Sequence, residues 1–229
     1  MKVAIIGAME TEVVRLKGLM QDAHSTSFAG LDFVEGTLAG VNAVVVRSGE
    51  GKVNAARCTQ ALCDHFAPDA IINTGIAGSL RKDLHICDVV VSSDLVQHDM
   101  DVQGFGYAIG EIPQLGMTYF EADERLVQVT LDAARALGIK ACVGRVASGD
   151  QFIDDEEKKR RIIDNFDASC CEMEGAAIAQ VAWLNKVPFV VVRAISDNAD
   201  DATVEDQFEY VAADISARLV ERMMQHLED

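Results

Sequence analysis

Three short stretches of the chain are apolar almost without interruption: residues 3–6, 70–72 and 187–195. Continuous apolar runs of this length are typical of strands that are covered on both faces, as in the centre of a parallel sheet. Parallel neighbours need crossover connections, which are usually helices. The pattern therefore predicts an α/β fold with these three stretches as central strands.

Helical spacing dominates the sequence between and after these runs. Near the end of the chain, apolar residues recur every three or four positions from Phe208 to Leu227, which predicts a long amphipathic helix. We expect further helices at residues 10–21, 52–66, 121–137, 156–166 and 173–186. Most segments between these helices look extended.

Residues 31–38 and 41–46 flank Ala39-Gly40 and predict an antiparallel hairpin. The sheet is therefore expected to be mixed, mostly parallel and twisted, in a three-layer α/β/α arrangement. Because no Ser- or Pro-rich linker divides the chain, we expect residues 1–229 to form a single domain. The longest irregular stretch, residues 103–118, is a candidate functional loop.

The charge balance narrows the range of partners. The chain has 37 acidic and 20 basic residues, a formal net charge of −17. A strongly acidic surface disfavours broad contact with nucleic acid or with an anionic membrane. We therefore expect a small-molecule partner, and neither nucleic acid nor membrane.

No segment approaches the roughly 18 consecutive apolar residues of a membrane-spanning helix. The first residues are interpreted as a strand rather than a signal sequence, because Glu10 and Glu12 follow at once. The six cysteines contain no CxxC pair, and the five histidines show no zinc-binding spacing. These features predict a cytoplasmic protein with no metal and no cofactor.

Carboxylates follow several of the apolar runs. Glu12 comes shortly after the first strand, Glu174 lies where a helix is expected to begin, and Asp197 follows the run at 187–195. Ligands of open α/β sheets bind at the carboxyl ends of strands, so these three residues are expected to converge on one site. Alternatively, each is an acid near a helix start, where the macrodipole favours it.

Familiar nucleotide-binding fingerprints are missing from the sequence. Residues 49–52 read Gly-Glu-Gly-Lys, but a phosphate loop would need Gly at position 46 and Ser or Thr at position 53, and both are Val. Neither GxGxxG after the first strand nor a GxSxG elbow is present. The glycines at 75–78 follow the strand expected at 70–74 and permit close approach of a ligand, although turn chemistry alone explains them.

Several segments together carry a specific resemblance. They are Ile5-Ile6-Gly7-Ala8-Met9-Glu10 with Glu12, Ser48-Gly49 with Gly51-Lys52-Val53, Ile72-Asn73-Thr74-Gly75 with Ala77-Gly78, Ser148-Gly149-Asp150 with Phe152-Ile153, Glu172-Met173-Glu174 with Ala177, and the stretch 187–197. With these motifs the whole chain resembles the bacterial 5′-methylthioadenosine/S-adenosylhomocysteine nucleosidases of the nucleoside phosphorylase superfamily. The resemblance implies the fold of that superfamily and hydrolysis of the N-glycosidic bond of methylthioadenosine and S-adenosylhomocysteine, with 5′-deoxyadenosine as a further expected substrate.

The resemblance also implies catalytic roles. Asp197 would protonate N7 of adenine as a general acid, and for this it must be desolvated or hydrogen-bonded in a way that favours its acid form. Glu12 would orient and deprotonate the attacking water, while Glu174 would bind the ribose hydroxyls. Arg193 would order the acidic cluster, since three nearby carboxylates would otherwise repel one another.

Further positions match ligand-lining residues of the same family. Phe152 would stack on adenine, the main chain of Ile153 would contact the purine edge, and Ser196 would support Asp197. The other matches to the ligand pocket are Met9, Gly78, Met173 and Phe208. Phe105 and Pro113 match residues that reach the pocket of the neighbouring subunit, which implies a homodimer.

Two positions depart from the family pattern. Ile76 stands where a small hydroxyl residue is frequent in the family, which removes a hydrogen-bonding group beside the sugar. The phosphorylases place Arg and Ser or Thr at this turn, whereas this chain has Asn73 and Ile76, so hydrolysis is favoured over phosphorolysis. Glu50 replaces an apolar residue near the 5′ pocket and either favours a cationic tail such as that of S-adenosylhomocysteine or is a solvated acid before a helix.

Three alternatives stay open at this point. The chain is either a phosphate-dependent purine nucleoside phosphorylase, a nucleosidase for another 5′-modified adenosine such as an aminofutalosine, or a noncatalytic adenosine-binding or storage protein of the same fold. The joint presence of Glu12, Glu174 and Asp197 argues against the noncatalytic alternative.

Overall fold

The computed structural model describes residues 1–199 and 206–227 of the chain. Its helices are α1 (Glu10–Leu19), α2 (Lys52–Phe66), the short 3₁₀-helix η1 (Gln103–Phe105), α3 (Glu124–Leu137), α4 (Glu156–Phe166), α5 (Gly175–Leu184) and α6 (Asp206–His226). Its strands are β1 (Lys2–Gly7), β2 (Gln21–Phe28), β3 (Leu31–Leu38), β4 (Val41–Arg47), β5 (Ala70–Ser79), β6 (Val89–Gln97), β7 (Phe120–Glu121), β8 (Ala141–Ser148), β9 (Cys170–Glu172) and β10 (Phe189–Asp197). These elements give the α/β class that the sequence predicts.

All ten strands belong to one mixed sheet. The strands β4, β1, β5 and β10 lie side by side and are parallel to one another. The hairpin β3–β4 is antiparallel, as predicted, and β2 extends it at the edge. On the other side β10 pairs with β6, β6 with β8, β8 with β9, and β9 again with β5. The sheet therefore curls back on itself at this end.

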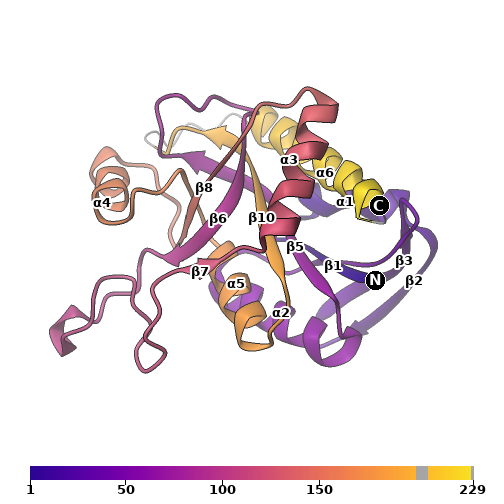
Figure 1. The fold of residues 1–229 in the computed structure, drawn as a ribbon, viewed down its shortest axis with the longest axis horizontal. Coiled ribbons are helices and arrows are strands. Elements are labelled where there is room, and N and C mark those ends of the chain that lie inside the picture. The colour runs from indigo at the N-terminus through magenta and orange to yellow at the C-terminus, as the bar shows by residue number, and fades with distance from the viewer. Residues whose placement is uncertain (200–205, 228–229) are drawn as a thin grey trace.

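Helices cover both faces of the sheet (Figure 1). The strand β1 shows why its sequence is apolar throughout, because successive side chains point to opposite faces. Ala4 and Ile6 pack in the cluster that contains α2 and α5, while Val3 and Ile5 pack in the cluster that contains α1, α3 and α6. The predicted three-layer arrangement is confirmed.

Several helix ends follow from local sequence. The side chain of Asp123 accepts a hydrogen bond from the Leu126 N–H and caps the start of α3, and Gly138, with φ of 67°, ends that helix. Asp155 caps α4 in the same way. Such caps satisfy N–H groups that have no partner inside the helix.

Some predicted boundaries are wrong. The glycines at 75–78 do not form a turn after a strand that ends at 74, because β5 continues through them to Ser79 and pairs there with β9 and β10. The first helix ends at Leu19 rather than at 21, since the chain enters the edge strand β2 at Gln21. The helix expected from 173 begins only at Gly175, because β9 ends at Glu172 and Glu174 is the N-cap of α5 with a non-helical backbone.

The expected irregular stretch 103–118 contains η1 and one isolated bridge between Ile112 and Met117. Between β6 and β7 the chain runs out from the main body before it returns to the sheet (Figure 1). Within the described part of the chain, no helix is long and apolar enough to cross a membrane.

Candidate active site

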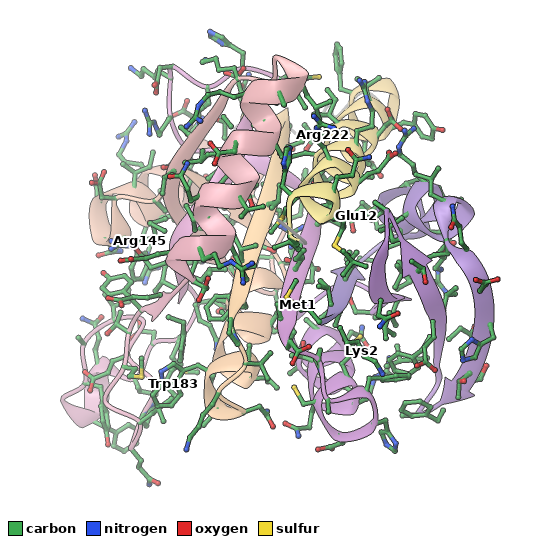
Figure 2. All side chains as sticks on the ribbon, turned by 45° about the vertical axis from the view of Figure 1, so that its right-hand side comes forward. Met1, Lys2, Glu12, Arg145, Trp183 and Arg222 are labelled. Atoms are coloured by element: carbon green, nitrogen blue, oxygen red, sulfur yellow. The ribbon has the colours of Figure 1, made fainter. Side chains whose placement is uncertain are left out.

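A cavity of about 200 Å³ lies at the carboxyl ends of the central strands. Glu12, labelled in Figure 2, is buried at 1% exposure, whereas Trp183 is 42% exposed. The cavity is lined by Ala8, Met9, Glu12, Glu50, Ile76, Ala77, Gly78, Gln151, Phe152, Ile153, Cys171, Glu172, Met173, Glu174, Arg193, Ser196, Asp197 and Glu209. The expected convergence of Glu12, Glu174 and Asp197 is thus present in the structure.

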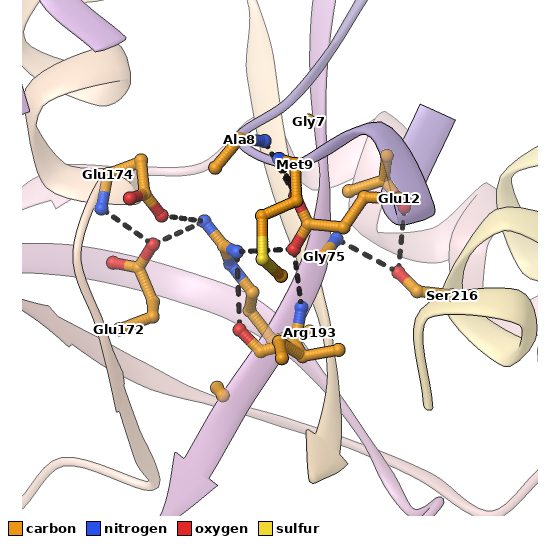
Figure 3. Close-up of polar contacts among 12 residues, drawn as sticks. Gly7, Ala8, Met9, Glu12, Gly75, Glu172, Glu174, Arg193 and Ser216 are labelled. Carbon is orange, nitrogen blue, oxygen red and sulfur yellow. Dashed lines mark hydrogen bonds and ion pairs between the residues drawn. The ribbon is translucent and has the colours of Figure 1, made fainter. Parts of the chain in front are cut away.

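Arg193 stands at the centre of the polar groups (Figure 3). Its side chain is 1% exposed and ion-pairs with Glu172, with Glu174 at 3.4 Å and with Glu12 at 3.8 Å. Its Nη2 also donates to Oδ1 of Asn73 at 2.6 Å. Burial lowers the pKa of Arg193, but the three carboxylates outweigh this and raise it above its usual value, so the guanidinium stays charged.

Glu12 is fixed by main-chain donors. Its Oε2 accepts from the N–H groups of Ala8 and Met9 at 2.6 and 2.9 Å, and its Oε1 accepts from the Ile76 N–H at 3.1 Å. Burial raises the pKa of Glu12 above its usual value, and this outweighs Arg193 and the three N–H donors. A carboxylate with a raised pKa is suited to accept a proton near neutral pH.

Ile76 contributes its main chain rather than a side-chain hydroxyl. Besides the N–H bond to Glu12, its carbonyl accepts from Nη1 of Arg193 at 3.2 Å. The polar contacts at this position are therefore made by the backbone of β5, and the side chain adds an apolar surface to the cavity.

Glu174 and Glu172 lie together on the other side of Arg193 (Figure 3). Glu174 Oε1 accepts from the Gly51 N–H at 2.8 Å. Glu172 accepts from the N–H groups of Glu174 and Gly175 at the start of α5 and from the Ser148 hydroxyl. Burial and the Glu172 carboxylate raise the pKa of Glu174 to about 7, against the opposing charge of Arg193.

Gly75 allows Glu12 and Arg193 to meet. A Cβ at this position would lie 2.9 Å from Glu12 Cδ and closer still to Glu12 Oε1 and Arg193 Nη1. Behind this point the Ser216 hydroxyl of α6 accepts from the Gly75 N–H at 3.2 Å and lies 2.8 Å from the Thr74 hydroxyl. The long C-terminal helix thus holds the strand on which the acidic cluster rests.

Asp197 lies at the end of β10 and lines the cavity, as do Phe152, Ile153 and Gly78. One carboxylate oxygen is 2.8 Å from the Ser196 hydroxyl, and the other accepts from the Ala199 N–H at 2.8 Å. A Cβ on Gly78 would come within 2.8 Å of Asp197 Oδ1, so the missing side chain leaves this carboxylate its place.

Three of the predicted site residues lie outside this cavity wall. Phe208 is 36% exposed, and on its turn of α6 the neighbouring Glu209 lines the cavity instead. Phe105, 86% exposed, and Pro113 belong to the segment between β6 and β7. Both were expected at a neighbouring subunit's site, which a single chain does not contain.

Sequence reasoning missed the roles of two residues of the site. Asn73, fully buried, joins Arg193 to the Ile6 carbonyl at the end of β1, and Glu172 makes a direct ion pair with Arg193. The available signal was an acid or an amide inside an otherwise apolar strand, because such a group needs a buried partner. Among the described residues, no group of three or more His, Cys, Asp or Glu side chains has the arrangement of a metal site.

Comparisons with known proteins agree with this geometry. The model of the phosphorylase superfamily matches residues 2–225. A 5′-methylthioadenosine/S-adenosylhomocysteine nucleosidase of Shewanella piezotolerans is 47% identical over 92% of each chain.

Two solved structures extend the comparison. The same kind of nucleosidase from Neisseria meningitidis, in complex with methylthio-immucillin-A, has a TM-score of 0.95 and 40% identity over 98% of this chain and 99% of that one. A futalosine hydrolase of Helicobacter pylori has a TM-score of 0.94 and 35% identity over 98% and 97%.

Proposed function

The chain belongs to the phosphorylase superfamily, and within it we propose that this protein hydrolyses the N-glycosidic bond of 5′-methylthioadenosine and S-adenosylhomocysteine, releasing adenine and the 5-thio-substituted ribose. The observation that carries the proposal is the meeting of Glu12, Glu174 and Asp197 in one cavity around the buried Arg193. 5′-Deoxyadenosine, which offers the same bond, is a further proposed substrate.

In the proposed reaction the bond between C1′ and N9 breaks as positive charge develops on the sugar. Asp197 donates a proton to N7, so that adenine leaves as a neutral base. The Ser196 hydroxyl at 2.8 Å fixes the position of the Asp197 carboxyl. Phe152, which lines the same cavity, stacks on the purine, and the main chain of Ile153 contacts the purine edge.

Water attacks C1′ from the face opposite the base and gives its proton to Glu12. The three main-chain donors that hold Glu12 aim its carboxylate without a side-chain rearrangement, which lowers the entropy cost of the step. Glu174 binds the ribose hydroxyls, Met9 contributes to the apolar surface for the thioether, and Met173 is a further apolar residue of the cavity wall. Arg193 keeps the acids together and stays clear of the chemistry.

The charges of the cavity favour water over phosphate as the nucleophile. Among the described residues that line it, six carry carboxyl groups and one, Arg193, carries a cation. That cation is 1% exposed and already paired with Glu172 and Glu174. An anion entering this cavity would be repelled by uncompensated carboxylates. Phosphorolysis, the main alternative reaction, is therefore disfavoured.

The assembly and location are part of the same proposal. The protein acts as a cytoplasmic homodimer in which Phe105 and Pro113 of each subunit reach the other subunit's cavity. Support comes from Phe105, a large apolar side chain that is 86% exposed on a segment projecting from the main body (Figure 1). An aromatic ring so exposed in one chain is typical of an interface residue.

The experiment is adenine release from methylthioadenosine in phosphate-free buffer, followed by ultraviolet absorbance, with analysis of the sugar product. Free methylthioribose from the wild type, and a loss of turnover with retained binding in Asp197→Asn, are expected. A requirement for phosphate with a sugar 1-phosphate product would establish the phosphorylase alternative. Binding without turnover in the wild type would establish the noncatalytic one. Faster turnover of an aminofutalosine than of either thioether would reassign the substrate.

A further inference from the structure

Two carboxylates in the cavity wall neither take part in the proposed chemistry nor pair with Arg193. They are Glu50, in the loop between β4 and α2, and Glu209, in the first turns of α6. In the described part of the chain neither side chain has an ion-pair partner, whereas Glu12, Glu172 and Glu174 share Arg193. Their charges are therefore available to a ligand.

The loop that carries Glu50 is held in one conformation. Its flanking glycines, Gly49 and Gly51, both have positive φ, which disfavours other residues there. The Glu50 carbonyl accepts from Nδ2 of Asn54 at 2.7 Å, and the Gly51 N–H donates to Glu174 at 2.8 Å. The residue that follows Glu50 thus contacts Glu174, the residue proposed to bind the ribose.

The order of the strands places Glu50 away from the purine end. Asp197 ends β10, and Glu50 follows β4, with β5 and β1 lying between these two strands. The strands β10 and β4 are therefore three strand spacings apart, or about 14 Å. If N7 of the base faces Asp197 and the ribose lies against Glu174, the 5′ substituent points toward Glu50.

Glu209 reaches the cavity from a different element. It precedes Ser216 by seven residues on α6, a rise of about 10 Å along the helix axis. The helix that holds Gly75 through Ser216 thus also contributes Glu209 to the cavity wall. Two separate segments therefore supply unpaired negative charge to one cavity.

Building on the proposed function, we propose that Glu50 and Glu209 form a subsite for an ammonium group carried on the 5′ substituent of an adenosine thioether. The subsite makes the protein prefer 5′ tails with a net positive charge over neutral tails of equal length and over anionic tails. A zwitterionic homocysteinyl tail gains from its ammonium and loses from its carboxylate, so it benefits less than a purely cationic one.

The test compares the 5′-aminopropylthio and 5′-butylthio derivatives of adenosine, which differ in an ammonium against a methyl group. Adenine release gives kcat/KM for each, and their ratio is measured in the wild type, Glu50→Gln, Glu209→Gln and the double variant. The matched control is Glu157→Gln, which removes one charge from the exposed face of α4, outside the cavity. Methylthioadenosine serves as the reference substrate throughout.

The ratio is expected to fall about fivefold in Glu50→Gln, the upper end for an exposed ion pair, and further in the double variant. It should stay at the wild-type value in Glu157→Gln and should weaken in the wild type at high salt. A ratio that is the same in the wild type and the double variant, even if the double variant has a lower Tm, would show that the two carboxylates only stabilise the starts of helices α2 and α6. That result overturns the subsite and leaves the hydrolysis intact. No adenine release from any of the three substrates would overturn the proposed function and the subsite with it.

Discussion

Replacing Gly75 with Ala is expected to disable the acidic cluster while the fold persists. Gly75 lies in β5 with an ordinary extended backbone, so the conformation itself admits alanine. The added methyl would occupy the space where Glu12 and Arg193 meet. The change therefore acts on the relative position of these two side chains.

The structure gives the size of the displacement. The new Cβ would lie 2.9 Å from Glu12 Cδ, whereas ordinary van der Waals contact begins at 3.4 Å. The carboxylate must move by at least about 0.5 Å, and its Oε1 by more. Overpacking of this kind costs about 1–3 kcal/mol of stability. Misplacing a reacting group by about 1 Å costs about 100-fold in rate.

The assay is kcat for adenine release from methylthioadenosine, together with urea unfolding of the same preparations. Gly18→Ala is the matched control, because nothing lies within 4 Å of its Cβ and the residue is in helix α1. It should retain wild-type activity and gain up to about 1 kcal/mol. If Gly75→Ala folds and keeps kcat within threefold of the wild type, the contact between Glu12 and Arg193 does not set the activity.

Three further predictions concern the buried polar groups. Because burial raises the pKa of Glu174 to about 7, the stability that this group contributes is full below about pH 4.5 and is lost as the pH rises to 7. Over this range the free energy of unfolding in urea should fall by about 3 kcal/mol more in the wild type than in Glu174→Gln. Parallel pH curves for the two proteins would contradict this prediction. Asn73→Ala removes the acceptor that lies 2.6 Å from Arg193 Nη2 and should lower the free energy of unfolding in urea by about 1–3 kcal/mol. An unchanged urea midpoint would show that this contact does not stabilise the fold. Ser216→Ala leaves the Gly75 N–H without its hydroxyl acceptor and should lower the free energy of unfolding by a similar amount. Ser27→Ala, on the exposed strand β2, should have little effect, and an equal loss of stability in the two variants would refute the role of the Ser216 hydroxyl.

Much of the fold could be predicted from the sequence because strands that are buried on both faces have continuous apolar sequences. In β10 the residues from Phe189 to Ile195 are apolar except for Arg193, and an arginine in such a run demands buried acids. Glu12 and Asp197 were found because polar residues at the carboxyl ends of strands differ from the apolar runs before them, and Glu174 was found as an acid at an expected helix start.

Other features of the fold and the site have no recognisable sequence pattern. The strand β2 has an exposed, mainly polar sequence, since it forms the edge of the sheet, so it shows neither alternation nor an apolar run. The closure of the sheet through β9 depends on three residues, of which Glu172 serves the active site rather than the core. The partnership of Asn73 with Arg193 joins residues 120 positions apart and exists only in the folded chain.

The most direct test of the account is a crystal structure of the protein with a 5′-methylthio nucleoside mimic that carries a cationic sugar. We expect N7 of the base within hydrogen-bond distance of Asp197, the ribose hydroxyls on Glu174, and a water between Glu12 and the anomeric position. A base bound at the Glu50 end of the cavity, or a sugar that leaves no room for water beside Glu12, would contradict it.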